Sequence, residues 1–333
     1  MTLKKDDLPE SRPAVSVVMA VYNASQYIAA SVSSVLAQTF PDFELIVVND
    51  GSQDSAELET ALAPYRERIR YIRQENRGVS GARNAGLRVA RGRFYAQIDA
   101  DDAWKPGYLE SQLNFLEQNP AMDLVYPNAE VFTEGSSGHL DFMDLSPSRG
   151  EATFENLVRQ NCVVMTSVTA RMEAIRKTGY FDESLVSCED FDFWLRFTKF
   201  GGRIGYHQQK LVRYRRGANS LSSDRARMIA NLLRVLAKAR DYDLTPAERT
   251  AIDEETRSNQ AVLDLMEGKK ALFGKDIDKA IEHLSSANSH LHSRKVSLAL
   301  WALRRSPQMV RWAVNLRRWS SSKSEKAFLS GID

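Results

Sequence analysis

The chain has 333 residues, of which 43% are hydrophobic and 26% charged, the composition of an ordinary globular protein. This composition excludes a disordered chain, a collagen and a coiled-coil rod, and the length predicts about two domains. The formal charge of +2 divides unevenly, because residues 1–220 carry 25 basic and 29 acidic side chains whereas residues 221–333 carry 20 and 14. We therefore predict an acidic domain over 1–220 and a basic extension over 221–333, an asymmetry found in proteins that contact a polyanion or a membrane surface.

The two cysteines, Cys162 and Cys188, form neither a disulfide framework nor a CxxC metal pair, which favours a reducing compartment. The amino-terminal segment lacks the apolar core of a signal peptide. The longest uncharged stretch, residues 13–41, is interrupted by Asn, Ser and Gln, so a strand and a helix are expected there instead of a membrane span. These features predict a cytoplasmic protein.

Strand and helix patterns alternate over the first 126 residues. Strands are predicted at 15–21, 44–48, 69–72, 94–98 and 124–126, and helices at 27–37, 55–62, 80–89 and 107–117. This order predicts an α/β fold with right-handed crossovers and a mostly parallel sheet that has helices on both faces. Ligands of such sheets bind beyond the carboxyl ends of the strands, where the turns at Tyr22, at 50–52 and at 99–102 would meet.

The pattern changes in the second half of the chain. Residues 135–150 are rich in Gly and Ser and predict a loop, and residues 154–214 are mixed. Within residues 189–197, Phe193, Trp194 and Phe197 are spaced to share one apolar helical face. The remaining sequence predicts an all-α extension with helices at 226–240, 247–267 and 277–287.

Two acidic positions follow predicted strands. Asp99, Asp101 and Asp102 would repel one another, and a hard divalent cation, Mn²⁺ or Mg²⁺, would offset that repulsion and could bind a diphosphate. The alternative is a solvated acidic turn. Asp50, at the end of the second strand, can accept hydrogen bonds from a ribose or a uracil, or can simply form an Asp-Gly turn.

Two predicted helix starts also carry candidate residues. Residues 78–86 lack the spacing of the GxGxxG dinucleotide fingerprint, which argues against a nicotinamide dehydrogenase. Arg83, in the first turn there, could direct its charge at a nucleotide, unless the segment only caps and packs the helix.

In residues 189–192, Asp190 at a helix start beside aromatic residues suits a general base, with helix capping as the alternative.

The carboxyl-terminal segment has no acidic residue between Glu282 and Glu325. Its basic residues and tryptophans are Arg294, Lys295, Trp301, Arg304, Arg305, Arg311, Trp312, Arg317, Arg318, Trp319 and Lys323. Interfacial helices combine tryptophan with Lys and Arg in this way, although a basic solvated face is an equal alternative. We expect no nucleic-acid partner, because no nucleic-acid module accompanies the charge.

Together these motifs resemble the inverting GT-A glycosyltransferases of family 2. The matching blocks, in order, are residues 15–23, 38–52, 75–86, 99–106 and 189–196. The resemblance therefore spans residues 13–200 and leaves the extension unexplained. It implies a Rossmann-like GT-A fold and a nucleotide-diphospho-sugar donor, usually a UDP-sugar.

The resemblance also implies roles for single residues. The donor contacts would be Ala20, Tyr22, Asp50, Arg83, Asp99 and Asp101. Asp99 and Asp101 match the DxD motif, with Asp101 and Asp102 as the implied ligands of Mn²⁺ or Mg²⁺. Asp190 matches the proposed catalytic base, and Asp192 is the fallback, because the Asp-x-Asp repeat leaves the register ambiguous.

The implied activity is inverting, metal-dependent transfer of a hexosyl or N-acetylhexosaminyl group to a hydroxyl of a cell-envelope glycan or lipid-linked acceptor. Single-sugar transfer is expected, because residues 208–214 lack the Arg-Trp pair of the QxxRW motif found in processive members. The enzyme would work in the cytoplasm, docked on the inner face of the membrane by its basic extension. A sugar nucleotidyltransferase would need a GxGxR-type loop, which is absent, and a degenerate binding module would have a broken metal or base motif.

Overall fold

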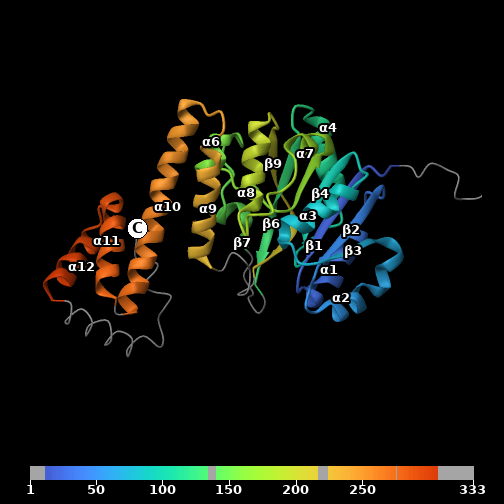
Figure 1. Ribbon diagram of the computed structural model, residues 1–333. Coiled ribbons are helices and arrows are strands. Elements are labelled where there is room, and N and C mark those ends of the chain that lie inside the picture. Colours follow the sequence, from blue (N-terminus) through green and yellow to red (C-terminus); the bar gives the residue numbers. More distant parts are fainter. Residues whose placement is uncertain (1–11, 134–139, 217–223, 275, 307–333) are drawn as a thin grey trace, which may run out of the picture. The chain divides into compact units, whose positions relative to one another are not determined.

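The computed structural model describes residues 12–133, 140–216, 224–274 and 276–306 (Figure 1). The chain divides into two compact units. One unit takes in the described residues of Met1–Ser223 together with Val235–Ala251, and the other takes in those of Asp224–Arg234 and Ile252–Asp333. Within the described ranges, none of the helices is both long and apolar enough to cross a membrane.

The first unit contains a sheet in the order β3-β2-β1-β4-β8-β6-β9-β5, with β7 paired to β6. The first four strands in the chain are mutually parallel: β1 (Val15–Val21), β2 (Phe43–Asp50), β3 (Arg70–Gln74) and β4 (Phe94–Asp99). In Figure 1 they form the blue-to-cyan side of the sheet. The predicted α/β fold is confirmed, and the ends of β1, β2 and β4 lie along one edge, since the three strands pair in parallel register.

The other half of the sheet mixes directions. Strand β8 runs antiparallel to both β4 and β6, whereas β9 pairs with β6 in parallel and with β5 antiparallel. The bounds are β5 (Ala103–Trp104), β6 (Leu124–Phe132), β7 (Leu140–Asp141), β8 (Val168–Arg171) and β9 (Ile204–Arg215). The helical pieces of this unit are α1 (Ser25–Leu36), α2 (Ser55–Leu62), the short 3₁₀ helix η1 (Ala63–Arg68), α3 (Gly78–Val89), α4 (Tyr108–Gln118), α5 (Phe142–Leu145), α6 (Phe154–Val158), α7 (Met172–Thr178) and α8 (Glu189–Lys199).

The centre of this unit is β1, which lies between β2 and β4. Its side chains Val17, Val18 and Met19 have no exposed surface, as expected for a parallel strand covered on both faces. Helix α3 packs so closely on β1 that a Cβ at Gly86 would come within 2.4 Å of the Cγ1 atom of Val18. The close approach fixes α3, and with it Arg83, relative to the edge of the sheet.

Four helices follow: α9 (Arg225–Ala239), α10 (Pro246–Phe273), α11 (Ile277–Leu291) and α12 (Arg294–Arg305). Helices α9 and α10 each contribute residues to both units. Asp276 caps α11 by accepting a hydrogen bond from the backbone N–H of Lys279. The second unit has its own core, made of Leu265, Ile277, Leu284, Ala287, Leu300 and Leu303. The all-α prediction is confirmed for the described residues, and the predicted basic residues after 306 lie outside them.

Candidate active site

The turns after β1 and β2 are held together by side chains. Asn23 adopts a left-handed backbone conformation with φ of 51°, and its Oδ1 accepts a hydrogen bond from the N–H of Gln53 (2.8 Å). The N–H of Asn23 in turn donates to the Oγ of Ser52 (3.1 Å). These bonds fix the backbone beside Tyr22, whose side chain is 47% exposed.

Asp50 ends β2 and is 2% exposed. Its Oδ1 accepts hydrogen bonds from the Nε2 of Gln74 (2.7 Å) and from the backbone N–H of Arg77 (2.9 Å). The next residue, Gly51, has a φ of +69°, and a Cβ there would lie 2.8 Å from the backbone nitrogen of Asn76. Asp50 therefore fixes the segment that leads into α3.

The acidic motif follows β4. Asp99 ends that strand and pairs in register with Ala20 of β1, so the two predicted donor contacts are strand neighbours. Asp102 is 1% exposed, and its Oδ1 accepts a hydrogen bond from the backbone N–H of Arg215 (2.9 Å). Its Oδ2 has no hydrogen-bond partner among the described residues. The side chain of Arg215 donates from Nε to the backbone oxygen of Asp101 (3.0 Å).

The carboxyl groups of Asp99, Asp101 and Asp102 lie close enough for each negative charge to disfavour ionisation of its neighbours. Burial, and then the charge of Asp99, raises the pKa of Asp101 to about 6. Burial and the charges of Asp99 and Asp101 together raise the pKa of Asp102 well above its ordinary value. The pair is therefore a place where a cation would be stabilised.

A divalent cation fits this pair. Within the described part of the chain no three His, Cys, Asp or Glu side chains are placed to hold a metal between them. Mg²⁺ and similar ions, however, commonly take one or two protein carboxylates and complete their coordination with substrate phosphates and water. The orphaned Oδ2 of Asp102 and the carboxyl group of Asp101 are oxygen donors of this kind.

Arg83 connects this loop to α8. Its side chain is only 3% exposed and lies 2.9 Å from Oδ1 of Asp99 and 2.6 Å from Oε1 of Glu189. Burial disfavours the charged guanidinium, but the two carboxylates outweigh that effect and raise its pKa. The resemblance implies that Arg83 contacts the donor. The structure places it beside the predicted diphosphate loop, between two carboxylates.

Asp190 lies in the first turn of α8, directly after Glu189. The preceding residue, Cys188, has a left-handed backbone with φ of 62° and gives the helix no side-chain cap, a strained conformation often found at functional sites. Oδ1 of Asp190 accepts the N–H of Phe191 (2.7 Å). Burial, and then the charge of Glu189, raises the pKa of Asp190 to about 7, a value suited to a general base.

Asp192 lies in a different environment. It has no exposed surface, and its two oxygens form ion pairs with Arg196 (Oδ2, 2.9 Å) and Lys238 (Oδ1, 2.8 Å). A carboxylate engaged by two cations in the interior is poorly placed to take a proton from a substrate. Of the two sequence candidates, the geometry therefore favours Asp190 as the base.

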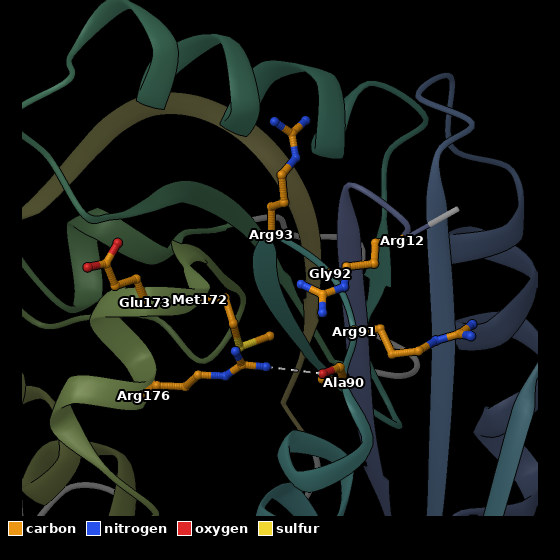
Figure 2. Close-up of a pocket in the computed structure, with 8 residues that line it drawn as sticks. All are labelled: Arg12, Ala90, Arg91, Gly92, Arg93, Met172, Glu173 and Arg176. Carbon is orange, nitrogen blue, oxygen red and sulfur yellow. Dashed lines mark hydrogen bonds between the residues drawn. The ribbon is translucent and has the colours of Figure 1, made fainter. Parts of the chain in front are cut away.

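The opposite end of β4 carries a cleft of about 550 Å³ (Figure 2). The lining residues are Arg12, Ala90, Arg91, Gly92, Arg93, Met172, Glu173 and Arg176. Figure 2 shows the Arg91 side chain directed away from Arg176; Arg91 is paired with Glu44 (3.3 Å). None of the predicted site residues lines this cleft, so the candidate site rests on the chemistry of the carboxyl edge.

Two contributors to the site were not predicted from the sequence. One is Glu189, the buried partner of Arg83. The other is Lys238: no local sequence pattern indicates its role, because its partners Asp182 and Asp192 lie more than 40 residues away in the sequence. The resemblance does imply that Arg213, Arg215 and Arg216 lie near the diphosphate, and Arg215, at the end of β9, contacts the acidic loop.

Replacing Arg83 with methionine should destabilise the fold by about 3–5 kcal/mol, because it leaves the buried Glu189 and the partly buried Asp99 without their cation. Arg73→Met is the matched control, since the Arg73–Glu59 pair is mostly exposed and should be worth less than about 1 kcal/mol. Urea unfolding of both variants measures the difference. Equal losses of stability in the two variants would show that the ion pairs of Arg83 contribute no more to folding than the exposed Arg73–Glu59 pair.

Comparison with known proteins identifies the family. The sequence profile described as Glycosyl transferase family 2 matches residues 16–174. An uncharacterized glycosyltransferase of Haemophilus influenzae is 30% identical over 234 residues, which cover 64% of this chain and 69% of that protein. An uncharacterized glycosyltransferase of Rickettsia bellii is 30% identical over 200 residues, or 59% of this chain. The match spans only 29% of the length of that relative.

Solved structures with the same fold include S. aureus TarS, residues 1–349, in complex with UDP-GlcNAc. Its TM-score is 0.61 at 18% identity, covering 92% of this chain and 91% of that one. The mannosyltransferase PcManGT of Pyrobaculum calidifontis, in complex with GDP-Man and Mn²⁺, has a TM-score of 0.59 at 18% identity, covering 93% and 85%. The sequence matches and the shared GT-A fold agree: the chain belongs to glycosyl transferase family 2.

Proposed function

We propose that this protein is an inverting, metal-dependent enzyme that transfers a single hexosyl or N-acetylhexosaminyl group from a UDP-sugar to an acceptor hydroxyl. The acceptor class is a cell-envelope glycan or its lipid-linked precursor. One observation carries the proposal: Arg83 pairs with Asp99 at the end of β4 and with Glu189 at the start of α8. The candidate diphosphate loop and the candidate base therefore share one edge of the sheet.

The donor would lie along this edge. Ala20, Tyr22 and Asp50 are proposed to border the base of the nucleotide, and Asp99 and Asp101 to face the diphosphate. The structures with the same fold contain nucleotide sugars, UDP-GlcNAc in TarS and GDP-Man in PcManGT. A uracil nucleotide is our preferred donor, on the resemblance of the sequence blocks.

Asp101 and Asp102 are the proposed ligands of Mn²⁺ or Mg²⁺, which when bound would neutralise negative charge on the departing diphosphate. Arg215 fixes the backbone of this loop through its bonds to the Asp101 carbonyl and the Asp102 carboxylate. The guanidinium also packs over the rings of Tyr27 (4.3 Å) and Phe132 (4.7 Å). These contacts hold the two ligands in place before the donor arrives.

Asp190 is the proposed base. Its ionised carboxyl group accepts the proton of the acceptor hydroxyl as the oxygen attacks the anomeric carbon from the face opposite the diphosphate. The bond between that carbon and the diphosphate oxygen breaks, its electron pair leaves with UDP, and the configuration inverts. A positioned base contributes about 10²–10⁴-fold to such a step.

Asp190→Asn should lower kcat by about 10²–10⁴-fold and leave the affinity for UDP nearly unchanged, since Asp190 would touch the acceptor and not the nucleotide. Calorimetric UDP titration and an assay of donor turnover measure the two effects. Glu117→Gln, an exposed carboxylate in α4, is the control. A parallel loss of UDP affinity would assign Asp190 to donor binding.

The rate should depend on pH through Asp190. Its pKa is raised to about 7, and only the ionised form accepts a proton, so kcat should fall by about tenfold for each pH unit well below 7. Above this range the rate should level off. A profile that stays flat between about pH 5 and 8 would contradict the assignment.

Asp101→Ala should weaken UDP binding in the presence of Mn²⁺ by roughly 10–100-fold or more, with little effect when the metal is chelated. Asp50→Asn is the contrasting variant, because a contact with the base of the nucleotide should be lost with or without metal. Calorimetry under both conditions separates the two. Equal weakening of Asp101→Ala in EDTA would remove this residue from the metal site.

We also propose that α12 docks on anionic lipid at the inner face of the cytoplasmic membrane. Leu298 and Trp301 are 66% and 58% exposed on this helix, and the guanidinium of Arg305 lies 5.6 Å from the Trp301 ring centre. Exposed apolar and aromatic groups among basic residues are typical of interfacial helices. Cys162 and Cys188 are buried and are not joined in a disulfide, which supports a reducing compartment.

The double variant Leu298→Ser and Trp301→Ser should reduce co-sedimentation with vesicles containing anionic lipid, because it removes the apolar contact while keeping the charge. Phe273→Ser removes an aromatic residue that is 52% exposed on α10 and should bind like the wild type. Unchanged binding of the double variant would exclude α12 as the docking surface.

A further inference from the structure

The start of α8 is paired with a helix that follows the whole sheet in the chain. Lys238 of α9 forms ion pairs with Asp182 (2.7 Å) and with Asp192 (2.8 Å). Asp192 is in the first turn of α8 and has no exposed surface. All three residues belong to the same compact unit, so this is an internal contact of the catalytic unit.

Arg196 extends the same network along the helix. Its Nε donates to the Oδ2 of Asp192 (2.9 Å), and its two terminal nitrogens donate to the backbone oxygens of Thr178 and Tyr180, both at 2.9 Å. Through Arg196, Asp192 therefore joins α8 to the end of α7 and the segment that follows it, and through Lys238 it joins α8 to α9. Removing one cation still leaves Asp192 with the other.

The charges in this network favour one another. Although burial opposes it, the hydrogen bonds from Lys238 and Ser184 lower the pKa of Asp182 to about 2. The pKa of Lys238 is raised by Asp182 and Asp192 against the effect of its own burial. Both pKa shifts favour the charged forms of Asp182 and Lys238, which strengthens the ion pair between them.

The ion pairs of Lys238 and Arg196 with Asp192 lie in the same helical turn as Asp190, the candidate base. The first turn of α8 begins after the left-handed Cys188 without a side-chain cap. Two ion-pair systems hold that turn instead, Arg83 on Glu189 and Lys238 on Asp192. Asp190 lies between these two anchored positions, so its orientation depends on both.

We propose that Lys238 is a positioning residue for Asp190: through Asp192 it fixes the rotation of the first turn of α8 and keeps the base directed at the acceptor. This inference rests on the proposed role of Asp190. It gives the helices after residue 220 a part in catalysis that is separate from membrane docking.

The test compares Lys238→Met with Lys199→Met. Lys199 anchors the last turn of the same helix by its pair with Glu248 (2.9 Å), so it controls for general support of α8. The readouts are hydrolysis of whichever of UDP-GlcNAc, UDP-glucose and GDP-mannose the wild type cleaves fastest, and affinity for its nucleotide by calorimetry. Lys238→Met should lower kcat on the order of 10²-fold, the cost of a small misplacement of a reacting group, with nucleotide affinity and donor KM unchanged.

Lys238→Arg should recover most of the lost kcat, because it restores a cation to Asp182 and Asp192. If Lys238→Met has no cooperative unfolding transition, Lys238→Gln takes its place, since the amide keeps a hydrogen-bond donor but not the charge. Wild-type kcat in the uncharged variant, or an equal fall in Lys199→Met, would overturn the proposal. Asp190→Asn is assayed alongside: if it stays active, the role of the base itself fails, whereas an inactive Asp190→Asn beside a fully active Lys238→Met refutes only the role of Lys238.

Discussion

The site depends on one buried cation, the guanidinium of Arg83 between Asp99 and Glu189. Burying an unpaired charge is costly, and the two carboxylates offset that cost only if both remain within a few ångströms. The end of β4 and the start of α8 are therefore held at a fixed separation, although 90 residues separate Asp99 from Glu189 in the sequence. Because α3 packs tightly on β1 at Gly86, the bridge is tied to the centre of the sheet.

Around this bridge lie carboxyl groups whose pKa values are raised by burial and by neighbouring carboxylates. Beyond β4, burial and the charge of Asp99 raise the pKa of Asp101, and burial with the charges of Asp99 and Asp101 raises that of Asp102. This arrangement favours a cation that can also bind a diphosphate. At the start of α8, burial and then the charge of Glu189 raise the pKa of Asp190 to about 7, where a carboxyl group is a stronger base.

The parallel half of the sheet was predictable from the sequence, because runs such as residues 15–21 are apolar on both faces and alternate with helical periods. The carboxylates at the strand ends were predictable for the same reason, since the topology brings those ends together. Strands β8 and β9 were not, because β8 has four residues and β9 is largely polar. Nor were the pairs of Arg83 and Lys238, which depend on how distant helices pack and leave no local pattern.

Asp190 is proposed to activate a nucleophile on the face of the sugar opposite the diphosphate. Proton NMR of the first sugar released from an α-linked UDP-sugar, recorded before the anomers interconvert, tests this directly through the coupling of the anomeric proton. Inversion gives the β-anomer as the first product. Initial release of the α-anomer would contradict it, because retention of configuration requires either a covalent intermediate or attack from the side of the leaving group.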